Sequence, residues 1–92
     1  MKDRALVVKV TMVTELTNEP YPDYCAKYFS EIFWNDNLDT YEYTLTERPH
    51  KAKMFPYNPS GNRNADAIKD MLKALIGNKA EVDVVECEVS VN

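Results

Sequence analysis

Glycine, histidine and long apolar runs are scarce in this 92-residue chain, and each scarcity excludes a class of protein. With only two glycines, the chain lacks the aromatic and glycine-rich signature of open-sheet RNA-binding modules. The single histidine, His50, has no serine, cysteine or carboxylate at a recognisable motif spacing, so we predict no catalytic residues and no enzymatic activity. Apolar runs end after three or four residues, as at 5–8, which argues against a transmembrane helix or a secretory leader and predicts a cytoplasmic protein.

Cysteine is scarce as well. Two cysteines, Cys25 and Cys87, are too few for a disulfide scaffold, and we expect both to be reduced residues of the core. The sequence also allows one disulfide bond between them. Two thiols and one distant histidine do not have the spacing of a zinc site. Paired carboxylates on a strand are a poor calcium site, because such sites usually take their oxygens from loops. We therefore predict no metal and no cofactor.

The net charge of −4 disfavours binding along free DNA or RNA, since such binding draws its affinity from many contacts of lysine and arginine with phosphates. An acidic protein is attracted instead to a basic surface, including one that normally holds phosphates.

The hydrophobic period changes along the chain in the order β-α-β-β-α-β. This order predicts a single α+β domain over residues 1–92 with the ferredoxin-like split βαβ fold, in which two helices cover one face of a four-stranded antiparallel sheet. Apolar residues alternate with polar ones in most of the predicted strands, which span 4–14, 39–47, 50–55 and 80–91.

Two segments carry helical spacing. The first, 21–34, begins near Pro22 and Asp23 and places Cys25, Phe29 and Ile32 on one stripe. The second, 64–76, has Asn64 as its cap and Gly77 as its stop, and the turn-forming residues 56–63 predict an exposed loop before it.

Four carboxylates mark the last predicted strand. A change of phase at Val84 and Val85 predicts a β-bulge, which would bring all four onto the open face of the sheet. This acidic row has two interpretations, an edge strand protected by charge or a functional surface that binds a partner. The carboxylates are Glu81, Asp83, Glu86 and Glu88.

Positive charge concentrates in the predicted central hairpin, at Arg48, His50, Lys51 and Lys53, and Arg63 extends it in the following loop. These residues are candidates for contact with a phosphate backbone or an acidic subunit. Cross-strand pairs with Glu42 and Glu47 explain the same pattern without any partner.

Aromatic residues exceed what a core of this size needs, so some of them are expected at the surface, where tyrosine and tryptophan are common anchors of protein interfaces. The group comprises Tyr21, Tyr24, Tyr28, Trp34, Tyr41, Tyr43 and Tyr57.

The small, acidic, tyrosine-rich and glycine-poor chain, from the run Met1-Lys2-Asp3-Arg4 through the split βαβ pattern, resembles phage anti-CRISPR inhibitors of the type I-F surveillance complex. These inhibitors share no motif, so the resemblance assigns no residues. It implies stoichiometric binding, in the cytoplasm of an infected bacterium, to subunits or guide RNA that normally hold target DNA, and hence a block of hybridisation.

We therefore expect a non-enzymatic inhibitor that binds a protein partner or the guide RNA that this partner carries, without a membrane or a small-molecule substrate. Two alternatives stay open: a small nucleic-acid-binding domain with steeply salt-dependent affinity, and a structural or dimerising phage module that forms a homo-oligomer.

Overall fold

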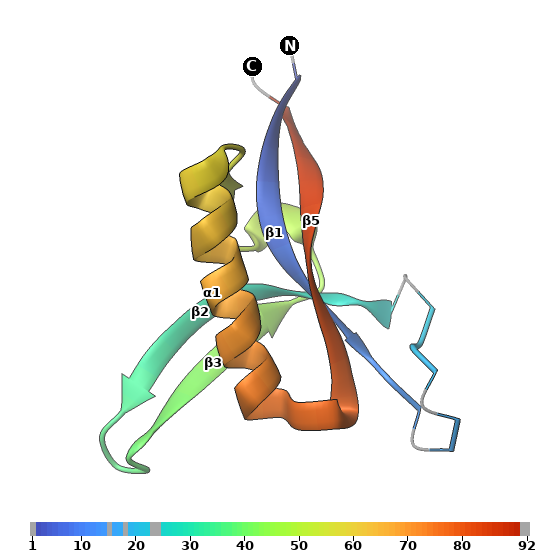
Figure 1. Cartoon of the computed structure of the whole chain (residues 1–92), viewed down its shortest axis with the longest axis vertical. Coiled ribbons are helices and arrows are strands. Elements are labelled where there is room, and N and C mark those ends of the chain that lie inside the picture. Colours follow the sequence, from blue (N-terminus) through green and yellow to red (C-terminus); the bar gives the residue numbers. More distant parts are fainter. Residues whose placement is uncertain (1, 15, 18, 23–24, 91–92) are drawn as a thin grey trace.

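The computed structural model describes residues 2–14, 16–17, 19–22 and 25–90. They form an α+β fold in which one helix packs on a sheet of five antiparallel strands (Figure 1). The elements are β1 (Lys2–Met12), β2 (Lys27–Asn35), β3 (Thr40–Thr46), a 3-10 helix η2 (Pro49–Lys51), β4 (Phe55–Pro56), α1 (Pro59–Ile76), a 3-10 turn η3 (Gly77–Lys79) and β5 (Ala80–Ser90).

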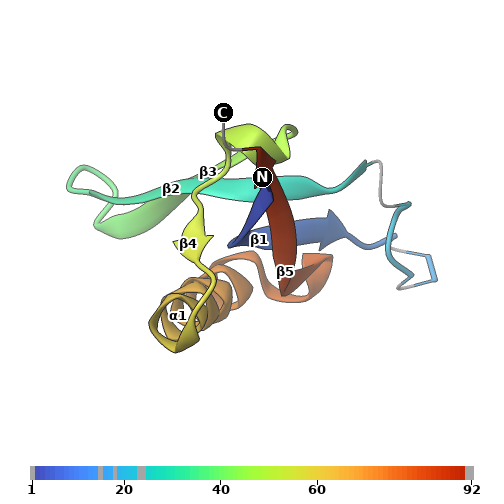
Figure 2. The same cartoon turned by 90° about the horizontal axis from the view of Figure 1, so that it is seen from above.

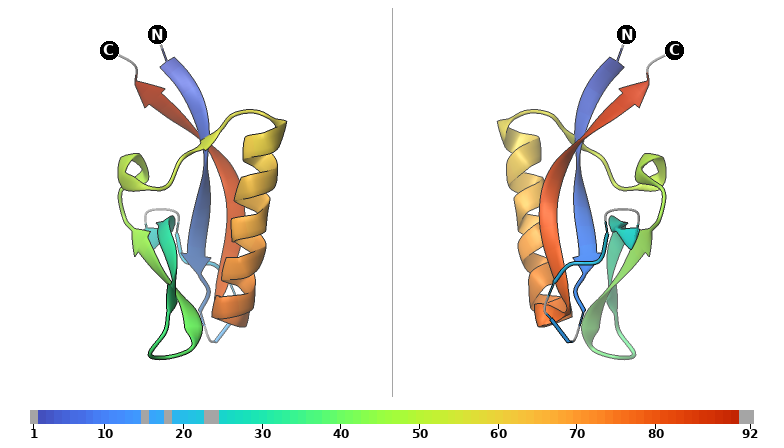
Figure 3. Two further views of the ribbon diagram at one scale, coloured as in Figure 1. Left: turned by 90° about the vertical axis from the view of Figure 1, so that its left-hand side faces the viewer. Right: turned by 90° about the vertical axis from the view of Figure 1, so that its right-hand side faces the viewer.

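Strand β1 is the centre of the sheet. It pairs with β5 along one edge, and with β4 and then β2 along the other. Figure 3 shows the β1–β5 ladder between α1 on one side and the β2–β3 hairpin with η2 on the other. This position agrees with the burial of both faces of β1, where Val7 and Val8 are only 1% and 0% exposed. The prediction of a first strand is confirmed, although β1 spans Lys2–Met12 rather than 4–14.

The core lies between α1 and the sheet. Leu72 and Ala65 of α1 are fully buried there against β1 side chains such as Val8, and Phe29 and Phe55 belong to the same cluster. The β2–β3 hairpin extends beyond this core, as Figure 2 shows from above. The radius of gyration is accordingly 13.9 Å, whereas about 12 Å is typical of a compact domain of this length.

The ferredoxin-like prediction is wrong, because the predicted first helix is a strand. Residues Lys27–Asn35 pair with β3, and a register shift between Phe29 and Glu31 interrupts that ladder. The shift places Phe29 and Ile32 on the same face, so a bulged strand reproduces the three-residue spacing of a helix. Asp23, the predicted dipole partner of that helix, lies outside the described residues.

Two further strand predictions need correction. The predicted third strand, 50–55, begins inside the 3-10 helix η2 and continues through residues 52–54, which are neither helix nor strand. Only Phe55–Pro56 pairs with β1. The predicted bulge in the last strand is also absent, because β5 pairs with β1 in one unbroken register from Ala80 to Ser90. The predicted end of this strand, Val91, lies outside the described residues.

Helix α1 begins earlier than predicted. Its cap is Asn58, whose side-chain Oδ1 accepts a hydrogen bond of 2.7 Å from the backbone N–H of Gly61, and Pro59 follows at the first helical position. The predicted loop 56–63 therefore forms β4 in part and the first turn of the helix. Gly77 ends the helix as predicted, with φ of 74°.

Replacing Asn58 by alanine removes the acceptor for the N–H of Gly61, and we expect a loss of about 1 kcal/mol in the free energy of unfolding. Asn58→Asp keeps the acceptor and is expected to lose much less. Urea denaturation of both variants tests this, and equal losses would show that the cap bond is not what stabilises the helix start.

Candidate binding surfaces

The four carboxylates of β5 do not share a face. Since the register with β1 is unbroken, alternate residues point to opposite sides of the sheet, so Glu81 and Asp83 lie on one face and Glu86 and Glu88 on the other. The acidic row expected from the sequence thus separates into two pairs, and all four residues are exposed.

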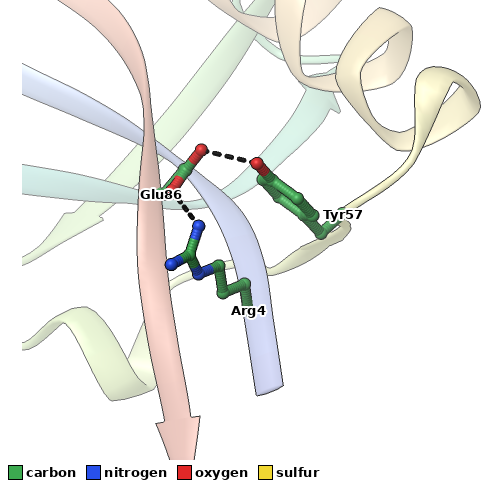
Figure 4. A network of polar contacts seen from close by, with 3 residues as sticks. All are labelled: Arg4, Tyr57 and Glu86. Carbon is green, nitrogen blue, oxygen red and sulfur yellow. Dashed lines mark hydrogen bonds and ion pairs between the residues drawn. The ribbon is translucent and has the colours of Figure 1, made fainter. Parts of the chain in front are cut away.

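Cationic side chains of β1 neighbour three of these carboxylates. Glu86 accepts a hydrogen bond of 2.7 Å from the Tyr57 hydroxyl and forms an ion pair of 3.3 Å with Arg4 (Figure 4). Arg4 lies directly opposite Glu88 in the register, and Lys9 lies directly opposite Asp83. Opposite charges across a ladder stabilise it modestly. These contacts favour the interpretation of β5 as an edge strand protected by charge.

The basic candidates lie outside any long strand. Arg48, Lys51 and Lys53 are exposed in and around η2, and the backbone N–H of Lys53 donates a hydrogen bond of 2.9 Å to the carbonyl of Phe29. This bond ties the basic segment to β2. Arg63 lies on α1 instead, where its guanidinium donates to Ser60 Oγ at 3.3 Å. The cross-strand pairing with Glu42 that the sequence allowed does not arise, because the partner of β3 is β2.

The β2–β3 hairpin carries an exposed group of apolar side chains that sequence reasoning did not identify as a surface. Trp34 and Tyr41 are paired across the ladder, and their rings meet edge to face with centroids 5.0 Å apart. They lie on the face that carries Ile32 and Tyr43 toward the core, but beyond it, and they are 48% and 46% exposed. Two further apolar side chains of the hairpin are exposed, Leu38 in its turn and Phe33 on the opposite face of the strands, where it pairs with Glu42.

The turn of the hairpin keeps the Leu38 side chain exposed. Asn35 Oδ1 accepts hydrogen bonds from the backbone N–H groups of Asn37 and Leu38, at 3.0 and 3.3 Å. Asp39 completes the turn with φ of 52°, a conformation that aspartate tolerates better than most residues. Leu38, at 62% exposure, is therefore displayed by a hydrogen-bonded turn.

The same hairpin is acidic over most of its length. Residues 28–47 contain no lysine or arginine, so Lys27, the first residue of β2, is the one cation of the two strands. We call the four exposed apolar side chains together with the carboxylates of this segment the hairpin surface. Its carboxylates are Glu31, Asp36, Asp39, Glu42 and Glu47.

Apolar side chains surrounded by charge of one sign are typical of a surface that binds a partner. A large exposed aromatic side chain supplies contact area, and a row of carboxylates selects a partner of opposite charge. The hairpin surface has both properties. Three of the four carboxylates of β5 have neighbouring cations instead, and Tyr57, the exposed aromatic residue beside them, is hydrogen-bonded to Glu86. The hairpin surface is the stronger candidate.

Two of the hollows that are open to solvent adjoin the core. One of 510 Å³ lies between β5 and the start of α1 and is lined by Tyr57, Asn62 and Glu86 among others, so the Glu86 network lies at its wall. The second, of 340 Å³, lies between β2 and α1 beside Phe29, Ile32 and Ile68. Both are shallow extensions of the core surface rather than enclosed sites.

The described part of the chain contains no group of three or more histidine, cysteine or acidic side chains arranged to hold a metal ion. Within the same residues, no helix combines the length and apolarity that a membrane span requires. Both cysteines are free, with Cys25 exposed and Cys87 partly buried, so the prediction that they are core residues is wrong for Cys25.

Comparison with known proteins finds no family model, no curated sequence and no solved structure that matches this chain.

Proposed function

We propose that this protein acts by binding rather than by catalysis, as an inhibitor that occupies a basic, nucleic-acid-binding surface on a type I-F CRISPR surveillance complex. The observation that supports this most is the hairpin surface, where four exposed apolar side chains lie among carboxylates with no cation between residues 28 and 47. A basic groove that holds DNA offers the complementary charge. Occupation of that groove would prevent the target from hybridising.

The basic segment around η2 supports a second contact within the same proposal. Arg48, Lys51 and Lys53 are exposed and lie next to β2, so a complex bound through the hairpin surface would have these cations close to its interface. Guide RNA supplies phosphates for them. Replacing Lys51 and Lys53 by glutamate is then expected to weaken binding to the ribonucleoprotein, with a smaller salt dependence than the unchanged protein shows.

The deciding experiment mixes the purified protein with a purified type I-F surveillance complex, separates the mixture by gel filtration, and measures target-DNA binding in the co-eluting fraction. Co-elution with lost DNA binding supports the proposal. Separate elution overturns it, and direct titration with DNA or RNA and measurement of the oligomeric state would then test the two alternatives. Co-elution with intact DNA binding would replace the hybridisation block by a block of nuclease recruitment.

Charge reversal distinguishes the two acidic surfaces. We expect Asp36→Lys combined with Glu42→Lys to weaken binding about tenfold, because both charges lie on the hairpin, where Asp36 is exposed and Glu42 is partly exposed. The matched pair Glu86→Lys and Glu88→Lys also adds four positive units, but on β5, and is expected to leave the affinity within about twofold. Affinity measured at two salt concentrations checks both variants, and the reverse ranking would assign the contact to β5.

A further inference from the structure

Strand β3 is an open edge of the sheet. Among the described strands, β3 pairs with β2 alone, at the end of the order β3-β2-β1-β4, and β5 pairs with β1 alone. An edge strand presents backbone N–H and C=O groups that another extended chain can pair with, and proteins usually block such edges with charged residues, proline or a bulge.

The two long edge strands, β3 and β5, differ in their protection against strand addition. Strand β5 carries four carboxylates in 11 residues, whereas β3 carries one, Glu42, in seven. The remaining six residues of β3 are threonine, tyrosine and leucine, which favour extended structure, and neither lysine nor proline is among them. The bulge of the hairpin is no protection either, because the register shift lies in β2, between Phe29 and Glu31.

The two faces of β3 define the chemistry of a strand that would pair with it. One face carries Tyr41, Tyr43 and Leu45, continuous with the core side of the sheet. The other carries Glu42 between threonines, and the rest of the segment 28–47 adds only negative charge. An added strand is therefore complementary when apolar residues alternate with lysine or arginine, since strand addition takes affinity from the backbone and specificity from alternate side chains.

A second copy of the chain fits this edge poorly. Two β3 edges brought together would also bring together two hairpins that each carry five carboxylates and no lysine or arginine between residues 28 and 47. Like charges across a ladder are destabilising. The charge of the hairpin thus selects against self-pairing and for a basic partner.

We infer that β3 accepts an extended, basic segment of a partner protein as a sixth strand of the sheet, with apolar side chains of that segment against Tyr41 and Tyr43 and its cations beside Glu42. This inference rests on the proposed function for the identity of the partner, but the edge and its chemistry are properties of this chain.

The test uses an eight-residue peptide in which valine and lysine alternate, blocked at both ends, and follows amide hydrogen exchange of the full chain residue by residue. We expect the peptide to slow exchange at every second amide of residues 40–46 by at least about tenfold, because only alternate N–H groups of an edge strand point outward. The same peptide with glutamate in place of lysine is the control and is expected to protect none of them. Glu42→Lys is expected to reduce the protection.

No protection by the basic peptide up to its solubility limit, protection of consecutive amides, or equal protection by both peptides would overturn the inference. Dimerisation of the free protein through β3, seen by analytical ultracentrifugation and by the same alternate protection, would also overturn it in favour of a second copy. The proposed function fails separately: alternate protection by the peptide without co-elution with the surveillance complex keeps the open edge and rejects that partner. Co-elution with the surveillance complex without alternate protection by the peptide keeps that partner and rejects strand addition at β3.

Discussion

Replacing Gly61 by alanine is expected to lower the free energy of unfolding by about 3 kcal/mol, the upper range for an overpacked site, and the melting temperature by roughly 12–24 °C. Gly61 is buried in the first turn of α1, and a methyl group there would lie 1.8 Å from the carbonyl oxygen of Pro56. That oxygen belongs to the backbone of β4, which pairs with Ala5 and Leu6 of β1. The clash therefore separates the helix from the sheet.

The control for this variant is Asn64→Ala, at an exposed position of the same helix. Alanine is the stronger helix former at both positions, so propensity alone predicts a small gain in stability for each variant. Thermal melting followed by circular dichroism distinguishes the two effects: a loss in Gly61→Ala alone is the expected result. A Gly61→Ala protein as stable as its parent would mean that the turn between β4 and α1 does not approach as closely as described.

The spacing of apolar residues predicted strand or helix correctly where the same spacing continued through a whole element. The β-branched apolar sequence of β1, the alternation in β3 and the buried stripe around Leu72 in α1 predicted the type of these elements correctly, with ends displaced by a few residues. Gly77 predicted the helix stop, because few other residues adopt its positive φ.

The spacing of apolar residues gave wrong predictions at the strands where a β-bulge is present or was expected. The bulge in β2 gives Phe29 and Ile32 the spacing of a helix, and nothing local in the sequence separates these two cases. At the other end of the chain, Val84 and Val85 suggested a bulge that the long pairing with β1 excludes. Both errors arise because strand pairing, a non-local interaction, decides the phase of a strand.

The sequence did not predict the hairpin surface, because residues 21–34 were predicted to be a helix. Trp34 and Tyr41 are seven residues apart, and only the β2–β3 ladder brings their rings together. With residues 21–34 taken as a helix, the aromatic excess had no common location. The absence of lysine and arginine from 28–47 was readable in the sequence and would have marked the segment as one acidic surface.

Replacing both Trp34 and Tyr41 by alanine is expected to weaken binding to the surveillance complex about 100-fold, because aromatic anchors at the centre of an interface each commonly contribute 2 kcal/mol or more and need not add fully. Their side chains extend past the core cluster, so the fold is expected to persist with a loss of about 1 kcal/mol from the aromatic pair. Isothermal titration calorimetry measures the affinity, and chemical denaturation measures the stability of the same preparation.

The matched control is Tyr21→Ala, since Tyr21 has nearly the same exposure, 45%, but lies outside the hairpin. Its replacement removes an exposed aromatic ring while leaving the hairpin surface unchanged, and the affinity is expected to stay within about twofold. If the control weakens binding as much as the double variant does, exposed aromatic area matters wherever it lies, and the hairpin has no special role. A folded double variant with unchanged affinity would move the interface to β5 or to the basic segment, where the charge-reversal variants already discriminate.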